Sequence, residues 1–110
     1  MTTNLYQELA SRTINKKLNR NAQRKHALHG MVGEIGELHS LYQKTYQGHK
    51  FDADHAKKEL GDLMWFIAEY CTANGWFLDE ICDMNIEKLM ARYPDGFSVD
   101  KSLNRAEGDI

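Results

Sequence analysis

Residues 30–70 read GMVGEIGELHSLYQKTYQGHKFDADHAKKELGDLMWFIAEY, and this stretch decides the fold because two acidic pairs lie within otherwise apolar, helix-like sequence. Glu34 and Glu37 are three residues apart, as are Glu59 and Asp62, so each pair shares one helix face. Both pairs are centred on Gly48, with Glu34 mirroring Asp62 and Glu37 mirroring Glu59. An antiparallel helical hairpin that turns at Gly48 would therefore bring all four carboxylates together.

The acidic pairs predict a metal-dependent active site. Four anions on a partly buried surface repel one another and lose hydration, so they require protons or a cation. An all-oxygen ligand set without histidine or thiolate suits Mg²⁺, with Mn²⁺ possible. Two solvated helix faces are the alternative, since Glu-x-x-Glu spacing is common, but the mirrored double pair favours the metal site. We predict that the same four acids are catalytic and bind the metal: Glu34, Glu37, Glu59 and Asp62.

The composition predicts one mainly helical domain in the cytoplasm. A chain of 110 residues with 42% hydrophobic residues and a single proline is long enough for one modest core. We place the domain at 1–96 and a polar C-terminal tail at 97–110, whose last five residues we expect to be disordered. No apolar run or signal-like segment predicts a membrane partner. Cys71 and Cys82 are expected to be buried, reduced thiols, which agrees with a reducing compartment.

Periodicity and capping residues predict an all-α fold, a four- to five-helix bundle built on the hairpin. A short helix is expected at 3–12 and another at 78–92. The two hairpin helices are expected to run from Asn19 or Asn21 to about Gln47, and from Asp52 or Asp54 to about Asn74, before Gly75. The apolar residues expected to form the buried stripe of the first are Leu28, Val32, Ile35, Leu38 or His39, and Tyr42.

Two features of the hairpin helices indicate crowded surroundings. Gly30, Gly33 and Gly36 recur every three residues, and each costs up to about 1 kcal/mol relative to alanine within a helix. Close approach of another helix, or room for a ligand beside the acids, would explain them. Residues 60–71 are apolar around most of the helix, so we predict a homo-oligomer that covers them, with burial inside a monomeric bundle as the alternative.

Charge is distributed unevenly along the chain. Residues 1–30 carry a net charge of +5 and residues 51–110 a net charge of −7, whereas the whole chain carries −2. The basic stretch 12–25 is consistent with a solvated or intersubunit face, or with a position near substrate phosphates. Nucleic acid is an unlikely partner, because the total charge is balanced and no aromatic residues alternate with the basic ones.

A second polar face is expected on the helix 78–92. Asn85, Lys88 and Arg92 share one side of it and could hold the phosphates of a nucleotide, although Arg92 near a helix C-terminus also has a dipole explanation. Trp65 could stack on a base, as could Phe66, His29 or Tyr42, but core or interface positions explain these side chains equally well.

The motifs resemble those of a known family. Three motifs carry the resemblance. They are Gly33-Glu34-Ile35-Gly36-Glu37-Leu38; Glu59-Leu60-Gly61-Asp62 with the following Leu63-Met64-Trp65-Phe66; and Asn85-Ile86-Glu87-Lys88-Leu89 with Arg92-Tyr93-Pro94. These three motifs are similar to those of the MazG-like all-α nucleoside triphosphate pyrophosphohydrolases. The likeness covers residues 28–96, and the E-x-x-E with E-x-x-D pair at this separation is fairly specific.

The resemblance implies a nucleoside triphosphate pyrophosphohydrolase, acting between the α and β phosphates to release pyrophosphate and the monophosphate, with a role in nucleotide-pool clean-up. It implies Mg²⁺ at the four acids, a dimer or a tetramer built from dimers, and substrate binding by Lys88, Arg92 and Asn85. It assigns no role to 12–25 or to the tail after Phe97.

Two alternatives belong to other functional classes. One is a non-catalytic regulatory module that keeps the fold and binds a nucleotide or a protein; the presence of all four acids and both cations counts against it. The other is a di-iron or di-manganese carboxylate bundle, which usually requires Glu-x-x-His, and no histidine follows any of the four acids by three.

Overall fold

The computed structural model describes residues 1–110 and confirms the all-α prediction. Its five helices are α1 (Thr3–Ser11), α2 (Arg20–Thr45), α3 (Ala53–Asn74), α4 (Leu78–Arg92) and α5 (Val99–Leu103), and it contains no strand. None of these helices combines the length and the apolar character that crossing a membrane requires.

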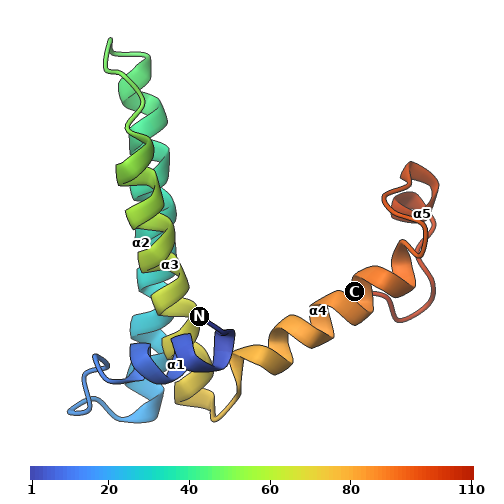
Figure 1. Ribbon diagram of the computed structural model, residues 1–110, viewed down its shortest axis with the longest axis horizontal. Helices are drawn as coiled ribbons and strands as arrows, with labels where there is room; N and C mark the ends of the chain where they lie inside the picture. The colour runs from blue at the N-terminus through green and yellow to red at the C-terminus, as the bar shows by residue number, and fades with distance from the viewer.

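α2 and α3 form a long antiparallel hairpin, and α4 leaves its base as a separate arm (Figure 1). α1 lies across the base and contacts both α3 and α4. The radius of gyration is 17.4 Å, whereas a compact domain of this length has about 13 Å. Within a single chain, the helices of the predicted bundle therefore do not all pack around one common core.

Local capping explains where the hairpin helices begin and end. The Asn19 side chain accepts a hydrogen bond from the Ala22 amide at 2.8 Å, and the Asp52 side chain accepts one from the His55 amide at 3.0 Å. Of the alternative caps, these are the two that the structure uses. Gly75 ends α3 at φ 73°, a left-handed conformation that favours glycine.

The apolar stripe predicted on α2 is not buried in the single chain. Val32 is 72% exposed and Tyr42 is 58% exposed, and Leu28 and Ile35 are also exposed. The buried residues of α2 are instead Ala27 and Leu41. Ala27 and Gly30 allow α2 to approach α3 closely, and most of the large apolar side chains lie on another face of α2. The prediction of which side faces the core was therefore wrong for the isolated chain.

One of the three glycines of α2 is explained by close packing. A Cβ atom at Gly30 would overlap the aromatic ring of Phe66 on α3. Gly33 and Gly36 face open space, because no atom lies within 4 Å of a Cβ built at either position. Close helix approach therefore accounts for Gly30 only.

Gln7 connects α1 to the start of α4. Its buried side-chain amide donates to Thr72 Oγ1 at 3.1 Å and to the Trp76 carbonyl at 2.8 Å. Its oxygen accepts a hydrogen bond from the Leu78 amide at 2.7 Å. Gln7 thus satisfies backbone groups at the turn where the chain leaves the hairpin.

The C-terminal tail of residues 97–110 folds back against α4, and the disorder expected for its last five residues stays a prediction. It contains α5 and then returns to α4, where the Arg92 guanidinium donates two hydrogen bonds to the Asp109 carboxylate (Figure 1). The cysteine prediction also holds for only one residue, since Cys71 is buried but Cys82 is exposed, and both are free thiols.

Gly30→Ala should destabilise the hairpin. The added methyl group must displace the Phe66 ring, and overpacking of this kind typically costs about 1–3 kcal/mol. Gly36→Ala is the matched control, with a gain of up to about 1 kcal/mol from helix propensity. Denaturant unfolding followed by circular dichroism measures both; equal stability of the two variants would contradict the packing role of Gly30.

Candidate metal centre

Three of the four predicted acids meet between α2 and α3. One carboxylate oxygen from each of Glu34, Glu59 and Asp62 lies within 4.8 Å of the others. Glu34 comes from α2, and the other two come from α3. These three acids therefore meet across the hairpin, as their spacing about Gly48 predicts.

Glu34 has the least satisfied carboxylate of the three. Its Oε2 atom is buried without a hydrogen-bond partner. A hydrogen bond to Glu59, which requires one of the two carboxyl groups to be protonated, raises the pKa of Glu34 from 4.5 to about 7. Burial and the charges of Glu59, Asp62 and Glu37 act in the same direction. Three hard oxygen ligands and an unpaired buried oxygen fit Mg²⁺ or Mn²⁺ chemically.

Glu37 lies outside the three-carboxylate group. Three residues turn an α-helix by about 300°, so Glu37 is about 60° around α2 from Glu34. Glu34 is half-buried at the seam, whereas Glu37 is exposed. Its charge still contributes to the raised pKa of Glu34. The pairing of Glu37 with Glu59 at one level of the hairpin stays a prediction.

Two residues beside the acids were missed in the sequence. His55 Nε2 lies 2.9 Å from Glu59 Oε1, one helical turn away, and the spacing of four residues was the available signal. Tyr6 of α1 lies near the other end of the group; burial, and then the charge of Asp62, raise the pKa of its hydroxyl. No local pattern indicates Tyr6, because α1 reaches the acids only through the tertiary fold.

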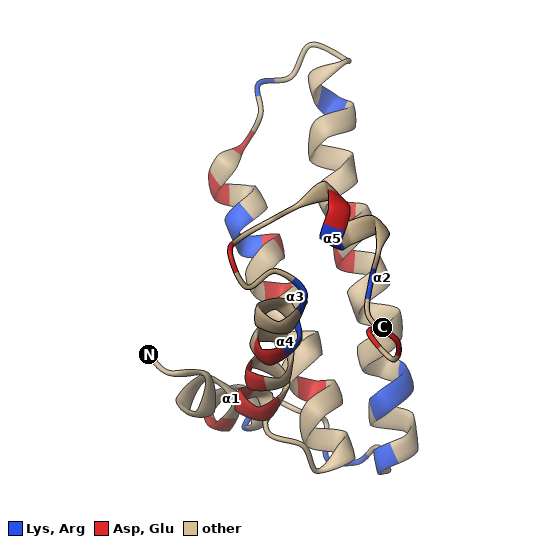
Figure 2. Cartoon of the chain, turned by 90° about the vertical axis from the view of Figure 1, so that its right-hand side faces the viewer, with Lys and Arg blue, Asp and Glu red and all other residues tan.

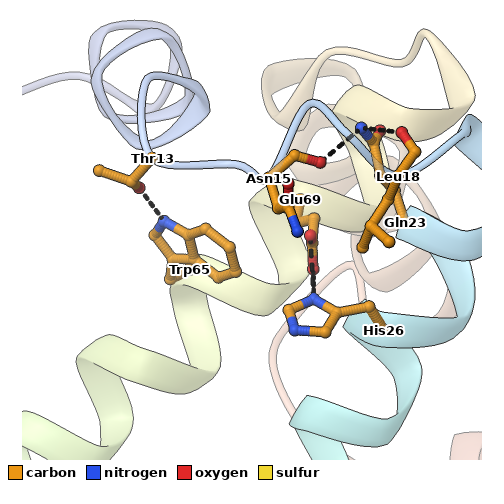
Figure 3. Close-up of polar contacts among 7 residues, drawn as sticks. All are labelled: Thr13, Asn15, Leu18, Gln23, His26, Trp65 and Glu69. Atoms are coloured by element: carbon orange, nitrogen blue, oxygen red, sulfur yellow. Dashed lines mark hydrogen bonds and ion pairs between the residues drawn. The ribbon is translucent and has the colours of Figure 1, made fainter.

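Trp65 is half-buried near the base of the hairpin, and its indole is already engaged. Its N–H donates to Thr13 Oγ1 at 2.8 Å (Figure 3). Its ring meets those of Phe66 and His26 edge to face. His26 Nδ1 in turn lies 2.8 Å from the carboxylate of Glu69, a side chain with no exposed surface. These contacts hold the loop after α1 and the base of α2 against α3.

The predicted phosphate-binding residues Asn85, Lys88 and Arg92 lie on α4, away from the acids within one chain (Figure 1). Figure 2 shows acidic positions along α3 and basic ones gathered at the beginning of α2. There, Arg24 donates to the Asn74 side chain at 2.8 Å and to the Ala73 carbonyl at 3.3 Å. Arg24 therefore contacts the end of α3, which is a structural role for part of the stretch 12–25.

Comparison with known proteins gives two matches. The model of the MazG nucleotide pyrophosphohydrolase domain matches residues 22–97, which include the three acids and all of α4. The Gene 37 protein of Mycobacterium phage L5 is 28% identical over 81 residues, covering 69% of this chain and 71% of the phage protein. No solved structure matches the chain significantly.

The acidic group should make the metal-free protein less stable as the pH rises. Because the folded state raises the pKa of Glu34 from 4.5 to about 7, it binds this proton more tightly than the unfolded chain does. The stabilisation is complete below pH 4.5 and is lost as the pH rises through about 7. Glu34→Gln, which cannot ionise, should lack this loss.

Denaturant unfolding in the presence of a chelator, at pH 5 and at pH 8, measures this difference. The free energy of unfolding of Glu34→Gln, relative to that of the unmodified protein, should be higher at pH 8 than at pH 5. A variant that is relatively less stable at pH 8 than at pH 5 would contradict the assignment. Added Mg²⁺ should stabilise the unmodified protein more at pH 8, because ligands must be deprotonated to bind a metal.

Proposed function

Because the chain belongs to the MazG nucleotide pyrophosphohydrolase domain family, we propose that it hydrolyses nucleoside triphosphates, deoxynucleotides included, between the α and β phosphates. The products are the monophosphate and pyrophosphate. The observation that carries this proposal is the convergence of Glu34, Glu59 and Asp62, with one buried carboxylate oxygen left without a partner. Clean-up of the nucleotide pool in the cytoplasm is the role that such an activity would serve.

The proposed cofactor is Mg²⁺, with Mn²⁺ as a substitute. A triphosphate brings about four negative charges, so it is repelled by an acidic centre without a cation. Glu34, Glu59 and Asp62 would hold the ion, which supplies charge neutralisation, polarises the phosphoryl oxygens and lowers the pKa of a bound water.

Glu37 is the carboxylate best suited to accept a proton from the attacking water. It lies outside the three-carboxylate group and is exposed, so metal binding would leave it free. Its charge acts on Glu34 one helical turn away, which supports a role beside the acidic centre. A general base must lie within reach of the proton it accepts while keeping an unoccupied oxygen.

Lys88 and Arg92, with Asn85, would bind the phosphates, but this requires a second copy of the chain. In one chain these residues belong to α4, whereas the acids belong to the α2–α3 hairpin, and the two are separate arms (Figure 1). Every residue of α4 from 80 to 91 is exposed, including Met84 at 64% and Met90 at 61%. Together with the exposed apolar stripe of α2, this supports a homodimer, or a tetramer of dimers, in which apolar surfaces cover one another.

The activity predicts release of pyrophosphate when the protein meets a panel of NTPs and dNTPs with Mg²⁺. Glu59→Gln removes one charged ligand and should lower kcat at least about 100-fold, with an unchanged circular dichroism spectrum. Glu8→Gln makes the same chemical change at an exposed position of α1 and should leave the rate unaltered. Absence of turnover on every nucleotide, modified ones included, would refute the proposal; binding without turnover would favour a regulatory module.

The oligomer predicts a solution mass of at least twice the 12.7 kDa of one chain. Met84→Glu places a charge in the exposed apolar surface of α4 and should shift the mass towards that of a single chain. Tyr46→Glu is the control, because Tyr46 is 92% exposed at the tip of the hairpin. Sedimentation velocity distinguishes these outcomes, and a monomeric unmodified protein would exclude the shared site.

A further inference from the structure

The C-terminal segment forms a hollow of about 440 Å³ with the end of α4. Its charged lining residues are Lys88 and Arg92 from α4, and Lys101, Arg105, Glu107 and Asp109 from the segment that follows. Four cations therefore face two carboxylates. This excess of positive charge contrasts with the acidic centre and favours an anionic ligand.

One anion already occupies the hollow, namely the side chain of Asp109. Arg92 Nε and a terminal guanidinium nitrogen donate to its two oxygens at 2.8 and 2.7 Å. The two side chains are only 10% and 13% exposed. The planar fork of a guanidinium binds carboxylate and phosphate oxygens in the same bidentate way, so Asp109 occupies a position that also fits a phosphate group.

The surrounding cations act on Asp109 as they would on a bound phosphate. Hydrogen bonds from Arg92 lower the pKa of the Asp109 carboxyl most, and the charges of Arg105 and Lys88 lower it further. The face of the Tyr93 ring lies 5.8 Å from the guanidinium carbon of Arg92 and helps to fix its orientation. Three cations from two segments therefore converge on one anion position.

We propose that the C-terminal segment extends and controls the phosphate site already proposed for Lys88 and Arg92. Lys101 and Arg105 add two cations to this site, and Asp109 holds the phosphate position at Arg92 until a polyphosphate displaces it. The inference deepens the proposed function and rests on it for the identity of the ligand. A polyphosphate can bind Arg92 only in molecules whose Arg92–Asp109 pair is open. The apparent affinity for the polyphosphate is therefore the intrinsic affinity multiplied by the open fraction.

Calorimetric titration with inorganic pyrophosphate, without divalent metal, tests the site directly. The acidic centre repels the anion under these conditions, so binding reports the cationic hollow. Asp109→Asn should tighten binding at least about fivefold, a coupling within the usual range for competing ligands. Glu107→Gln is the matched control, because it removes the same charge from the same segment without a contact to Arg92. An equal effect of both variants, or no binding, would overturn the proposal.

The added cations need their own test. In the Asp109→Asn background, Lys101→Gln or Arg105→Gln should weaken pyrophosphate binding about two- to fivefold, whereas Lys44→Gln at the far end of α2 should not. No effect of either substitution would overturn their assignment to the site and show that Asp109→Asn merely frees Arg92.

A non-hydrolysable triphosphate analogue with Mg²⁺ identifies the source of the polyphosphate. Tighter analogue binding by Asp109→Asn assigns the hollow to the substrate, whereas an effect on pyrophosphate alone assigns it to the free anion. These titrations do not depend on turnover, so loss of the proposed activity and loss of the anion site are separate results.

Discussion

Mutual repulsion among carboxylates across the α2–α3 seam is the constraint on which this structure depends. Glu34, Glu59 and Asp62 converge there, and the pKa of Glu34 is raised by its hydrogen bond with Glu59, by burial and by the neighbouring charges. Elsewhere in the hairpin, small residues allow close approach and paired polar groups lock it, as His26 does with Glu69. The fold therefore holds a group of like charges close together, and a bound cation would relieve the repulsion among them.

The positive charge that complements the acids is placed on another arm. α4 carries Lys88 and Arg92 but contributes little to the core of its own chain. This separation of charge fits a binding site formed between two copies of the chain. A single contact between them would bury the exposed apolar surface and bring the opposite charges together. Until that contact forms, Asp109 pairs with the Arg92 guanidinium within the same chain.

The sequence predicted the helices well because their ends carry their own signals. Asn19, Asp52 and Gly75 act locally, so caps and periodicity were sufficient. The acidic convergence followed from spacing alone. In contrast, the face of α2 that packs against α3 depends on how Gly30 receives Phe66, a tertiary contact that periodicity does not encode. Two other contacts could not be predicted from the sequence for the same reason, namely Tyr6 with Asp62 and Asp109 with Arg92. Each joins segments whose relative position is set by the whole fold.

Gln7 has a consequence for what counts as a foldable unit. It lies in α1, outside the residues 22–97 that the family model matches, yet it bonds the Trp76 carbonyl and the Leu78 amide at the hinge of α4. A fragment limited to the matched region would expose these backbone groups and leave the direction of α4 unspecified. The region that the family model matches is therefore smaller than the region needed to fix the direction of α4. The geometry of any site shared between chains depends partly on α1, which the family model does not include.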